Sequence, residues 1–142
     1  MIMKWVFKQF MRLQVTMYRR SGGKRFGQMR GMPLLLLTTV GRKSGVERVT
    51  PLMYTRDGDD YVVVASNNGA PKHPAWFLNL QAHPEVTIEV GETTYRMNAR
   101  QATSAEKARM WPPLAEKAPF YENYRKKTTR DIPMVILQAA GN

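Results

Sequence analysis

The sequence predicts a mainly β fold with flanking helices, and three observations support this prediction. Short apolar or alternating stretches recur between glycine-, proline- and aspartate-rich turns from Leu34 to Gln138, which is typical of strands joined by hairpins. Hairpin connections imply antiparallel pairing. Segments near residues 2–20, 74–82 and from 103 onward have helical spacing or helix-starting residues instead. For a chain of 142 residues, a helix packed on an antiparallel sheet or a small barrel is the expected architecture.

Residues 2–20 are predicted to form an amphipathic helix. One side carries Met3, Val6, Phe10, Leu13 and Met17, and the other carries Lys4, Lys8, Arg12 and Arg19. This helix either docks on the core with its basic side in water, or lies on an anionic membrane with Trp5 and Phe7 at the boundary. Ser21-Gly22-Gly23-Lys24 ends the helix. We therefore expect a helix and linker over residues 1–32 and one domain over residues 33–142.

The strands of the first half follow in order. Leu34 to Val40 is a compact apolar stretch, which predicts a strand buried on both faces. Gly41-Arg42-Lys43-Ser44-Gly45 forms the next turn. Val46 to Thr55 is the second strand, in which Pro51 requires an edge position or a bulge. Arg56 to Asp60 is a hairpin signal that leads into a third strand over Tyr61 to Ala65.

The second half alternates loops, helices and strands. Ser66 to Pro71 is a loop, and Pro74 starts a short helix that ends near Ala82. Glu85 to Val90 alternates as a strand, and Tyr95, Met97 and Ala99 mark the next one. Thr103 to Glu106 is a capping box that opens a helix, which Pro112 and Pro113 are expected to kink or break. Ile132 to Gln138 is the sixth strand.

The charge of the chain is concentrated at its beginning. Residues 1–46 contain ten cations and no acid, because the first acidic residue is Glu47. The net charge of +11 therefore belongs mostly to this segment, which suggests an anionic partner such as lipid, nucleic acid or an acidic ligand. The absence of cysteine excludes disulfides and thiolate chemistry. No apolar run or signal-peptide pattern indicates a membrane span or secretion, so we expect a cytoplasmic protein.

Few motifs indicate chemistry. There is no dinucleotide fingerprint, phosphate-binding P-loop or nucleophile elbow. The two histidines precede prolines without paired-ligand spacing, so no metal is expected. The turn at residues 41–45, with Arg48 nearby, is either a solvated hairpin tip or an anion site, because its glycines let successive N–H groups converge. Trp76 and Phe77, like Tyr121 and Tyr124, fit either a core or a pocket wall.

Three segments together indicate a family. LLLLTTVGRKSGVERVTPLMY, VVVASNNGAPKHPAWFLNLQAHPEV and FYENYRKKTTRDIPMVIL resemble the deazaflavin-dependent nitroreductases, also described as F420H2-dependent quinone reductases. The resemblance runs from about Leu34 to Leu137. It implies a split β-barrel related to FMN-binding oxidases that holds reduced coenzyme F420. It also implies hydride transfer from that coenzyme to quinones, activated enones or nitroaromatics.

The resemblance also implies roles for residues, since the coenzyme carries a phosphodiester and a polyglutamate tail on a flat apolar ring. The phosphate would be held by Arg42, Lys43 and Ser44, with Arg48 nearby. The ring would be enclosed by Val49, Thr50, Pro51, Leu52 and Met53, by Val64, Ala65, Ser66 and Asn67, and by Ala75, Trp76, Phe77, Leu78 and Asn79. The acceptor side would carry Ser66, Tyr121 and Tyr124 as catalytic residues, with Tyr121 also at the coenzyme. Asn67 stands where the family pattern has lysine, and Met53 where it has tyrosine.

Other interpretations of the same sequence remain. The basic segment also fits a module that binds nucleic acid or a membrane surface, and the fold could use FMN or haem in place of F420. With the F420 assignment we expect a small-molecule acceptor, no nucleic acid, and a monomer or weak dimer. Residues 2–20 then offer a peripheral attachment to the inner face of the membrane.

Overall fold

The computed structural model describes the backbone of residues 2–140 and the side chains of residues 6–140. The side chains of Met3, Lys4 and Trp5 therefore lie outside the described residues. The elements in chain order are α1 (Ile2–Arg20), β1 (Gln28–Met29), β2 (Met32–Val40), β3 (Glu47–Met53), β4 (Thr55–Asp57), β5 (Asp60–Val64), the 3-10 turn η1 (Asn67–Gly69), α2 (Ala75–Ala82), β6 (Glu85–Val90), β7 (Thr93–Gln101), α3 (Ser104–Lys117), α4 (Phe120–Lys127) and β8 (Met134–Ala139).

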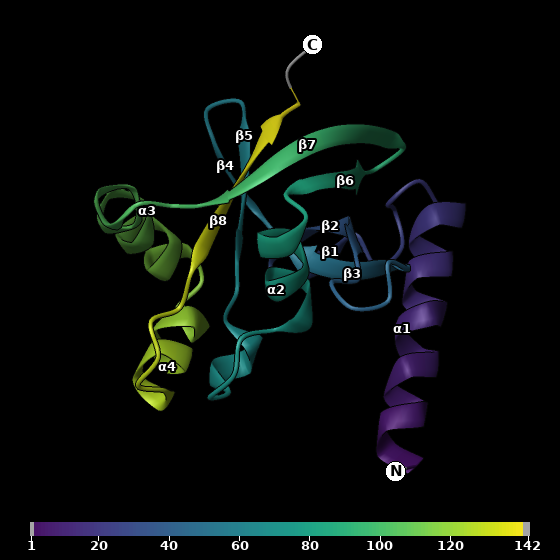
Figure 1. Ribbon diagram of the computed structural model, residues 1–142, viewed down its shortest axis with the longest axis horizontal. Coiled ribbons are helices and arrows are strands. Elements are labelled where there is room, and N and C mark those ends of the chain that lie inside the picture. Colours follow the sequence, from purple (N-terminus) through teal and green to yellow (C-terminus); the bar gives the residue numbers. More distant parts are fainter. Residues whose placement is uncertain (1, 141–142) are drawn as a thin grey trace.

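The strands form one antiparallel sheet with helices around it, which confirms the predicted fold class. The strand order is β1-β2-β6-β7-β8-β5-β4, and β3 pairs with β2 outside this path. Figure 1 shows α1 on one flank beside β3, α3 and α4 on the other flank, and α2 between them. The long strand β7 crosses the molecule and pairs with both β6 and β8. The sheet therefore bends around a core that α2 covers.

The leucine run forms β2 because its side chains are buried on both faces, as predicted. Leu35 and Leu37 pack into the main core cluster with residues of β5, β6, β8 and α2. Leu34 and Leu36 point the other way and pack with Tyr18 of α1. Successive strand residues alternate between faces, so one apolar run serves both layers.

The second predicted strand is shorter in the structure and is followed by an extra one. β3 pairs only with β2, so Pro51 lies on an edge strand, as expected for a residue without an N–H. β3 ends at Met53, and the Tyr54 N–H donates to the Pro33 carbonyl over 3.0 Å. Thr55 then belongs to β4, which joins β5 through a hairpin with Gly58 at a φ of 60°. Over residues 2–140 the sheet therefore has eight strands instead of the six predicted, since β1 and β4 were not predicted.

The three predicted helices agree with the structure except at two prolines, and α4 is a further helix that was not predicted. α2 begins after Pro74 and ends at Ala82, as predicted, and Thr103 and Glu106 form the predicted capping box of α3. α3 continues through Pro112 and Pro113 to Lys117, so the prolines do not break it. Met110, Trp111 and Leu114 are buried in a second core cluster. Burial of this helix face compensates for the two backbone hydrogen bonds that the prolines cannot donate.

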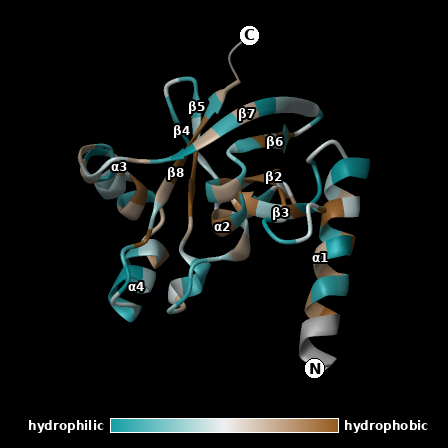
Figure 2. Ribbon diagram, viewed as in Figure 1, coloured by the Kyte–Doolittle hydropathy of each residue, from teal (hydrophilic) through white to brown (hydrophobic). Residues whose placement is uncertain are grey.

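α1 docks on the body, but not with its apolar side. The Tyr18 hydroxyl donates to the Leu34 carbonyl over 3.1 Å and accepts from the Gly91 N–H over 2.8 Å. Arg19 makes a two-pronged ion pair with Glu89. Of the predicted apolar stripe, 49% of Val6, 53% of Phe10 and 55% of Leu13 are exposed to solvent, and Met17 is half-buried. In Figure 2, hydrophilic and hydrophobic turns alternate along this helix.

Candidate functional site

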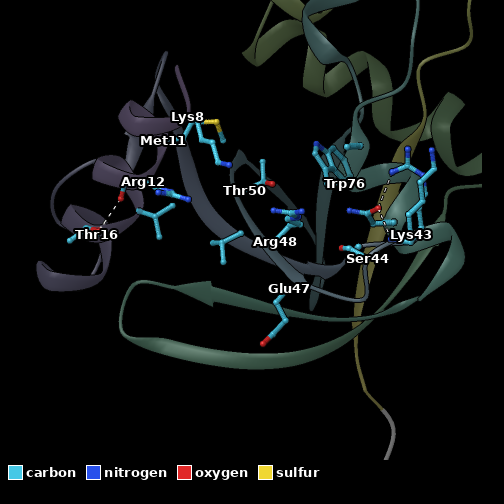
Figure 3. Close-up of a pocket in the computed structure, with 16 residues that line it drawn as sticks. Lys8, Met11, Arg12, Thr16, Lys43, Ser44, Glu47, Arg48, Thr50 and Trp76 are labelled. Atoms are coloured by element: carbon cyan, nitrogen blue, oxygen red, sulfur yellow. Dashed lines mark hydrogen bonds between the residues drawn. The ribbon is translucent and has the colours of Figure 1, made fainter. Parts of the chain in front are cut away.

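A cavity of about 850 Å³ lies between α1, β3, the turn at residues 41–45 and α2. Figure 3 shows the side chains around it. Nine of the residues that the sequence assigned to a coenzyme line this cavity: Arg42, Lys43, Ser44, Arg48, Val49, Thr50, Ala75, Trp76 and Asn79. Its size falls within the range of roughly 300–1,000 Å³ that is typical of small-molecule sites. Three stretches that are distant in sequence, residues 8–16, 41–50 and 75–79, therefore meet at one concave site.

The turn at residues 41–45 is held in a fixed shape by its own backbone. The Gly41 N–H donates to the Val46 carbonyl over 2.8 Å, and the Gly45 N–H donates to the Gly41 carbonyl over 2.9 Å. Ser44 Oγ accepts from the Val46 N–H over 3.1 Å. A Cβ on Gly41 would lie 2.6 Å from this Ser44 oxygen, so a larger residue at position 41 would displace the Ser44 side chain. The side chains of Arg42 and Lys43 project from the turn and are exposed.

Asn79 of α2 connects the turn to the core. Its Oδ1 accepts from both the backbone N–H and the guanidinium Nη1 of Arg42, over 3.1 and 3.0 Å. Its Nδ2 donates to Thr39 Oγ1 over 3.3 Å, and only 4% of the residue is exposed. The sequence assigned Asn79 to the ring wall, but in the structure this side chain orients Arg42. A buried amide with both ends satisfied holds that arginine in place.

The cavity has an excess of positive charge. Five cations line it, Lys8, Arg12, Arg42, Lys43 and Arg48, against one acid, Glu47. Within residues 6–140, none of these six side chains takes part in a salt bridge. The local excess is therefore four charges, five minus one. Unpaired cations converging on a concave surface attract an anionic ligand.

The sequence analysis missed the contribution of α1 to this cavity. Lys8, Met11, Arg12, Val15 and Thr16 all line it. The available signal was the spacing of Lys8, Arg12 and Thr16, because residues four apart share a helix face. That spacing shows that the three residues share one face of the helix. It does not show whether this face points toward the cavity, because that depends on how α1 docks.

A second group of predicted site residues lies outside the cavity. Met53, Val64, Tyr121 and Tyr124 pack in one hydrophobic cluster, while Ser66 is 9% exposed and Asn67 is exposed. α4 packs on η1, the turn that follows Ser66, and a Cβ on Gly69 would lie 3.0 Å from the Tyr124 carbonyl. The structure thus brings the tyrosines beside the Ser66 loop. β3 connects this group to the cavity, since Val49 and Thr50 line the cavity while Met53 reaches the cluster.

The two tyrosines differ in environment. Tyr121 is 3% exposed, and burial together with Tyr124 raises its pKa to about 12. The Tyr124 hydroxyl is half-buried and accepts from Arg30 Nη1 over 2.6 Å. The Arg30 guanidinium also lies 4.8 Å from the centre of the Phe120 ring. Arg30, which the sequence did not single out, thus orients the Tyr124 hydroxyl, whereas the raised pKa keeps Tyr121 protonated.

Arg130 fixes the loop that contains Ser66. Its guanidinium donates to the carbonyls of Ala65, Ser66 and Ala70 over 3.1, 2.7 and 3.0 Å. It also lies 3.1 Å from Nδ1 of His73, whose pKa burial and the neighbouring Arg130 charge both lower. A neutral His73 can accept this bond. The sequence did not indicate this arrangement, because it joins residues about 60 positions apart.

Asn67 also helps to shape this loop. Its Nδ2 donates to the Lys72 carbonyl over 2.9 Å, and it has a φ of 47°, in the left-handed region that asparagine tolerates. Asn68 has a φ of 55°. Asn67 therefore belongs to a strained turn that its own side chain closes.

The remaining predicted residues belong to the core. Ala65 and Phe77 are buried in the main cluster, and Leu52 and Leu78 pack against it. Trp76 lies in the same cluster and also lines the cavity. Pro51 lies on β3, next to Leu52.

In the part of the chain that the structure describes, no group of three or more His, Cys, Asp or Glu side chains is placed to hold a metal ion. No helix among residues 2–140 is long and apolar enough to span a membrane.

Comparison with solved structures defines the class. The haem storage protein HutZ of Vibrio cholerae shares the fold, with a TM-score of 0.58 and 15% identity over 93% of this chain and 92% of that one. An F420-H2 dependent reductase (FDR-A) is 38% identical, with a TM-score of 0.68, over 75% of this chain and 94% of that one. The protein is thus a split β-barrel with a basic cavity, as predicted.

Comparison of sequences gives the family. The profile of the F420H(2)-dependent quinone reductase family matches residues 10–139. An F420H(2)-dependent quinone reductase of Mycobacterium tuberculosis (strain ATCC 25618 / H37Rv) is 41% identical over 133 residues, which are 91% of this chain and 89% of that protein. The chain therefore belongs to the F420H(2)-dependent quinone reductase family, and the resemblance seen in the sequence is confirmed. A structure described as a domain-swapped dimer is 34% identical, with a TM-score of 0.71, over 97% of this chain and all of that one (100%).

Proposed function

We propose that this protein uses reduced coenzyme F420 to reduce a quinone. The observation that carries the proposal is the cavity with five cations, none of them in a salt bridge within residues 6–140. The coenzyme is a polyanion with a flat apolar ring, so its site needs a basic part and an apolar part. The cavity supplies the first, and β3 leads from it toward the buried cluster around Met53. The residues of the cavity and of β3 therefore fit coenzyme F420.

The turn at residues 41–45 would hold the phosphate. Arg42 presents a planar fork already oriented by Asn79, and Lys43 adds a point charge. Ser44 Oγ accepts from Val46, which leaves its proton free to donate to a phosphate oxygen. At about 3.3 Å per residue, β3 spans roughly 17 Å from Arg48 to Met53. This length lets one strand contact a ligand that reaches from the turn to the Ser66 loop.

The Ser66 loop and α4 would serve the acceptor. When bound, the reduced deazaflavin supplies a hydride, so the protein needs no acid–base pair of its own. Tyr124 is oriented by Arg30 and can donate its hydroxyl proton to an acceptor oxygen as negative charge develops there. Ser66 can donate in the same way from a loop that Arg130 holds rigid. The buried Tyr121 packs against Tyr124, with ring centres 6.1 Å apart, and keeps it in place.

We extend the proposed acceptors to activated enones and nitroaromatics. A site that aligns a hydride donor with an electron-poor acceptor depends on stacking and on donors for developing charge, which these compounds share with quinones. Asn67 and Met53 affect which of these acceptors the site prefers. Asn67 is engaged with Lys72, so no cation projects from that position toward an acceptor.

Turnover tests the proposed function. The purified protein should oxidise reduced F420 when a menadione-type quinone is added, with loss of the quinone in equal amounts. NADPH in place of reduced F420 should give no quinone reduction. Quinone reduction with NADPH but not with reduced F420 would contradict the proposal.

We also propose that α1 attaches the protein to the inner face of an anionic membrane. Val6, Phe7, Phe10 and Leu13 are 49–65% exposed, which is unusual for four large apolar residues on one helix. They lie beside the cations of an N-terminal segment that has no acid before Glu47. An amphipathic helix with these two properties binds at the headgroup boundary of anionic bilayers.

Sedimentation with vesicles tests this attachment. We expect the double variant Phe7→Ser and Phe10→Ser to lose at least about tenfold in binding to vesicles that contain anionic lipid, since each ring buries a large apolar area. Tyr95→Ser, which removes a 39% exposed aromatic from β7, is the matched control and should bind like the wild type. Equal partitioning of the double variant and the wild type contradicts membrane attachment. A change in molecular mass without a change in vesicle binding would assign the stripe to a contact between two copies instead.

A further inference from the structure

The cations of the cavity lie on two walls. In Figure 3, Lys8 and Arg12 extend from α1 on one side, Lys43 and Ser44 lie on the opposite side, and Arg48 lies between them. One phosphate group contacts cations at hydrogen-bond distance, about 3 Å. A phosphate held by the turn therefore leaves the cations of α1 without a partner. A ligand that satisfies both walls needs a second anionic part.

The α1 wall is held in place by strong contacts at the end of the helix. Tyr18 has three hydrogen-bond partners on the body, namely the carbonyls of Leu34 and Glu89 and the N–H of Gly91. Arg19 adds the two-pronged pair with Glu89. These contacts fix the rotation of α1, so that Lys8 and Arg12, four residues apart, face the cavity together. Thr16 lies on the same polar face, one turn closer to Tyr18 and Arg19. Its hydroxyl donates to the Arg12 carbonyl over 2.9 Å.

We propose that Lys8 and Arg12 form a second anion subsite, which binds the carboxylate-rich tail of the coenzyme while the turn at residues 41–45 binds its phosphate. This assignment rests on the proposed function. The tail is a chain of carboxylates on flexible links, so exposed lysine and arginine side chains can follow it without a rigid pocket. The apolar stripe of α1 faces away from this wall, since Val6, Phe10 and Leu13 do not line the cavity. One helix thus presents different faces to the coenzyme and to solvent.

Binding of two coenzyme forms tests the subsite without any turnover. One form carries the polyglutamate tail, and the other is shortened so that it keeps the ring and the phosphate but lacks glutamates. Dissociation constants come from quenching of deazaflavin fluorescence at 0.15 M salt, where distant exposed charges are screened. The wild type should bind the tailed form about tenfold more tightly, the advantage expected from two exposed charge pairs. The double variant Lys8→Gln and Arg12→Gln should lose this advantage and bind the short form within about twofold of the wild type.

A matched control removes two cations of the same segment that do not line the cavity. The double variant Arg20→Gln and Lys24→Gln should keep the advantage of the tailed form, because both residues are exposed and absent from the cavity wall. Retention of the advantage in the Lys8 and Arg12 variant overturns the subsite. Equal binding of both forms by the wild type also overturns it, while leaving the coenzyme assignment intact. If the wild type binds neither form, the proposed function fails as well.

Discussion

Removing the two charges of the turn at residues 41–45 is expected to weaken coenzyme binding at least about 30-fold. The change is the double variant Arg42→Gln and Lys43→Gln. Two charge-assisted hydrogen bonds to phosphate are worth about 2 kcal/mol or more, which corresponds to roughly 30-fold in the dissociation constant. Fluorescence quenching of F420 measures the effect. The turn itself should persist, because its backbone bonds from Gly41 and Gly45 do not involve these side chains.

The matched control for this variant removes two exposed cations elsewhere. Arg96 on β7 and Lys117 at the end of α3 are exposed and do not line the cavity. The double variant Arg96→Gln and Lys117→Gln has the same net charge as the turn variant. We expect it to bind the coenzyme within about twofold of the wild type at 0.15 M salt, where distant exposed charges are screened. Equal affinity of the turn variant and the wild type would refute the phosphate role.

Replacing Arg130 by methionine is expected to lower the free energy of unfolding by about 3 kcal/mol. The guanidinium donates to three loop carbonyls, and its loss removes the donor to Ala65, Ala70 and His73, while the Ser66 carbonyl keeps its bond from the Gly69 N–H. For a chain of this length such a loss lowers the melting temperature by roughly 10 °C. Calorimetry or denaturant unfolding measures the effect. Arg109→Met is the matched control, since Arg109 is 58% exposed and an ion pair in water, such as its pair with Asp57, adds little to stability.

The conservative variant Arg130→Lys separates positioning from stability. A lysine keeps the charge but cannot reach three carbonyls in a planar fork. We expect coenzyme affinity within about twofold of the wild type, because Arg130 does not line the cavity, together with a reduced kcat because Ser66 is less well held. A kcat equal to that of the wild type in a folded Arg130→Lys protein would contradict the positioning role.

Local patterns predicted most of the sheet because each strand has its own signal. The leucine run predicted β2, the alternation of Val86 and Ile88 predicted β6, and the glycine in the Asp57-Gly58-Asp59 turn predicted the hairpin that leads into β5. β1 was missed because two residues are too few for a period, and β4 because Tyr54 shows no sequence signal for the break after β3. The prolines of α3 were overinterpreted because packing of Trp111 and Leu114 outweighs a local preference.

Contacts between distant segments could not be predicted from the sequence. The helical period of α1 correctly gave two faces, but the docking direction depends on Tyr18, which contacts Leu34 and Gly91. The helical period alone therefore predicted the wrong side of α1 to pack against the core. The same holds for Arg130 and Arg30, whose partners lie about 60 and 94 positions away along the chain. The turn at residues 41–45 was visible in the sequence because its glycines and cations are adjacent.

Equilibrium binding of oxidised coenzyme F420, with FMN and haem as competitors, tests the central claim most directly. The claim is that the cavity and β3 form an F420 site in this chain. Fluorescence titration should give saturable one-to-one binding of F420, which weakens as salt is raised because the cavity cations bind its anionic parts. FMN and haem at tenfold excess should leave this binding unchanged. Absence of saturable F420 binding, or its displacement by FMN at equal concentration, would contradict the account.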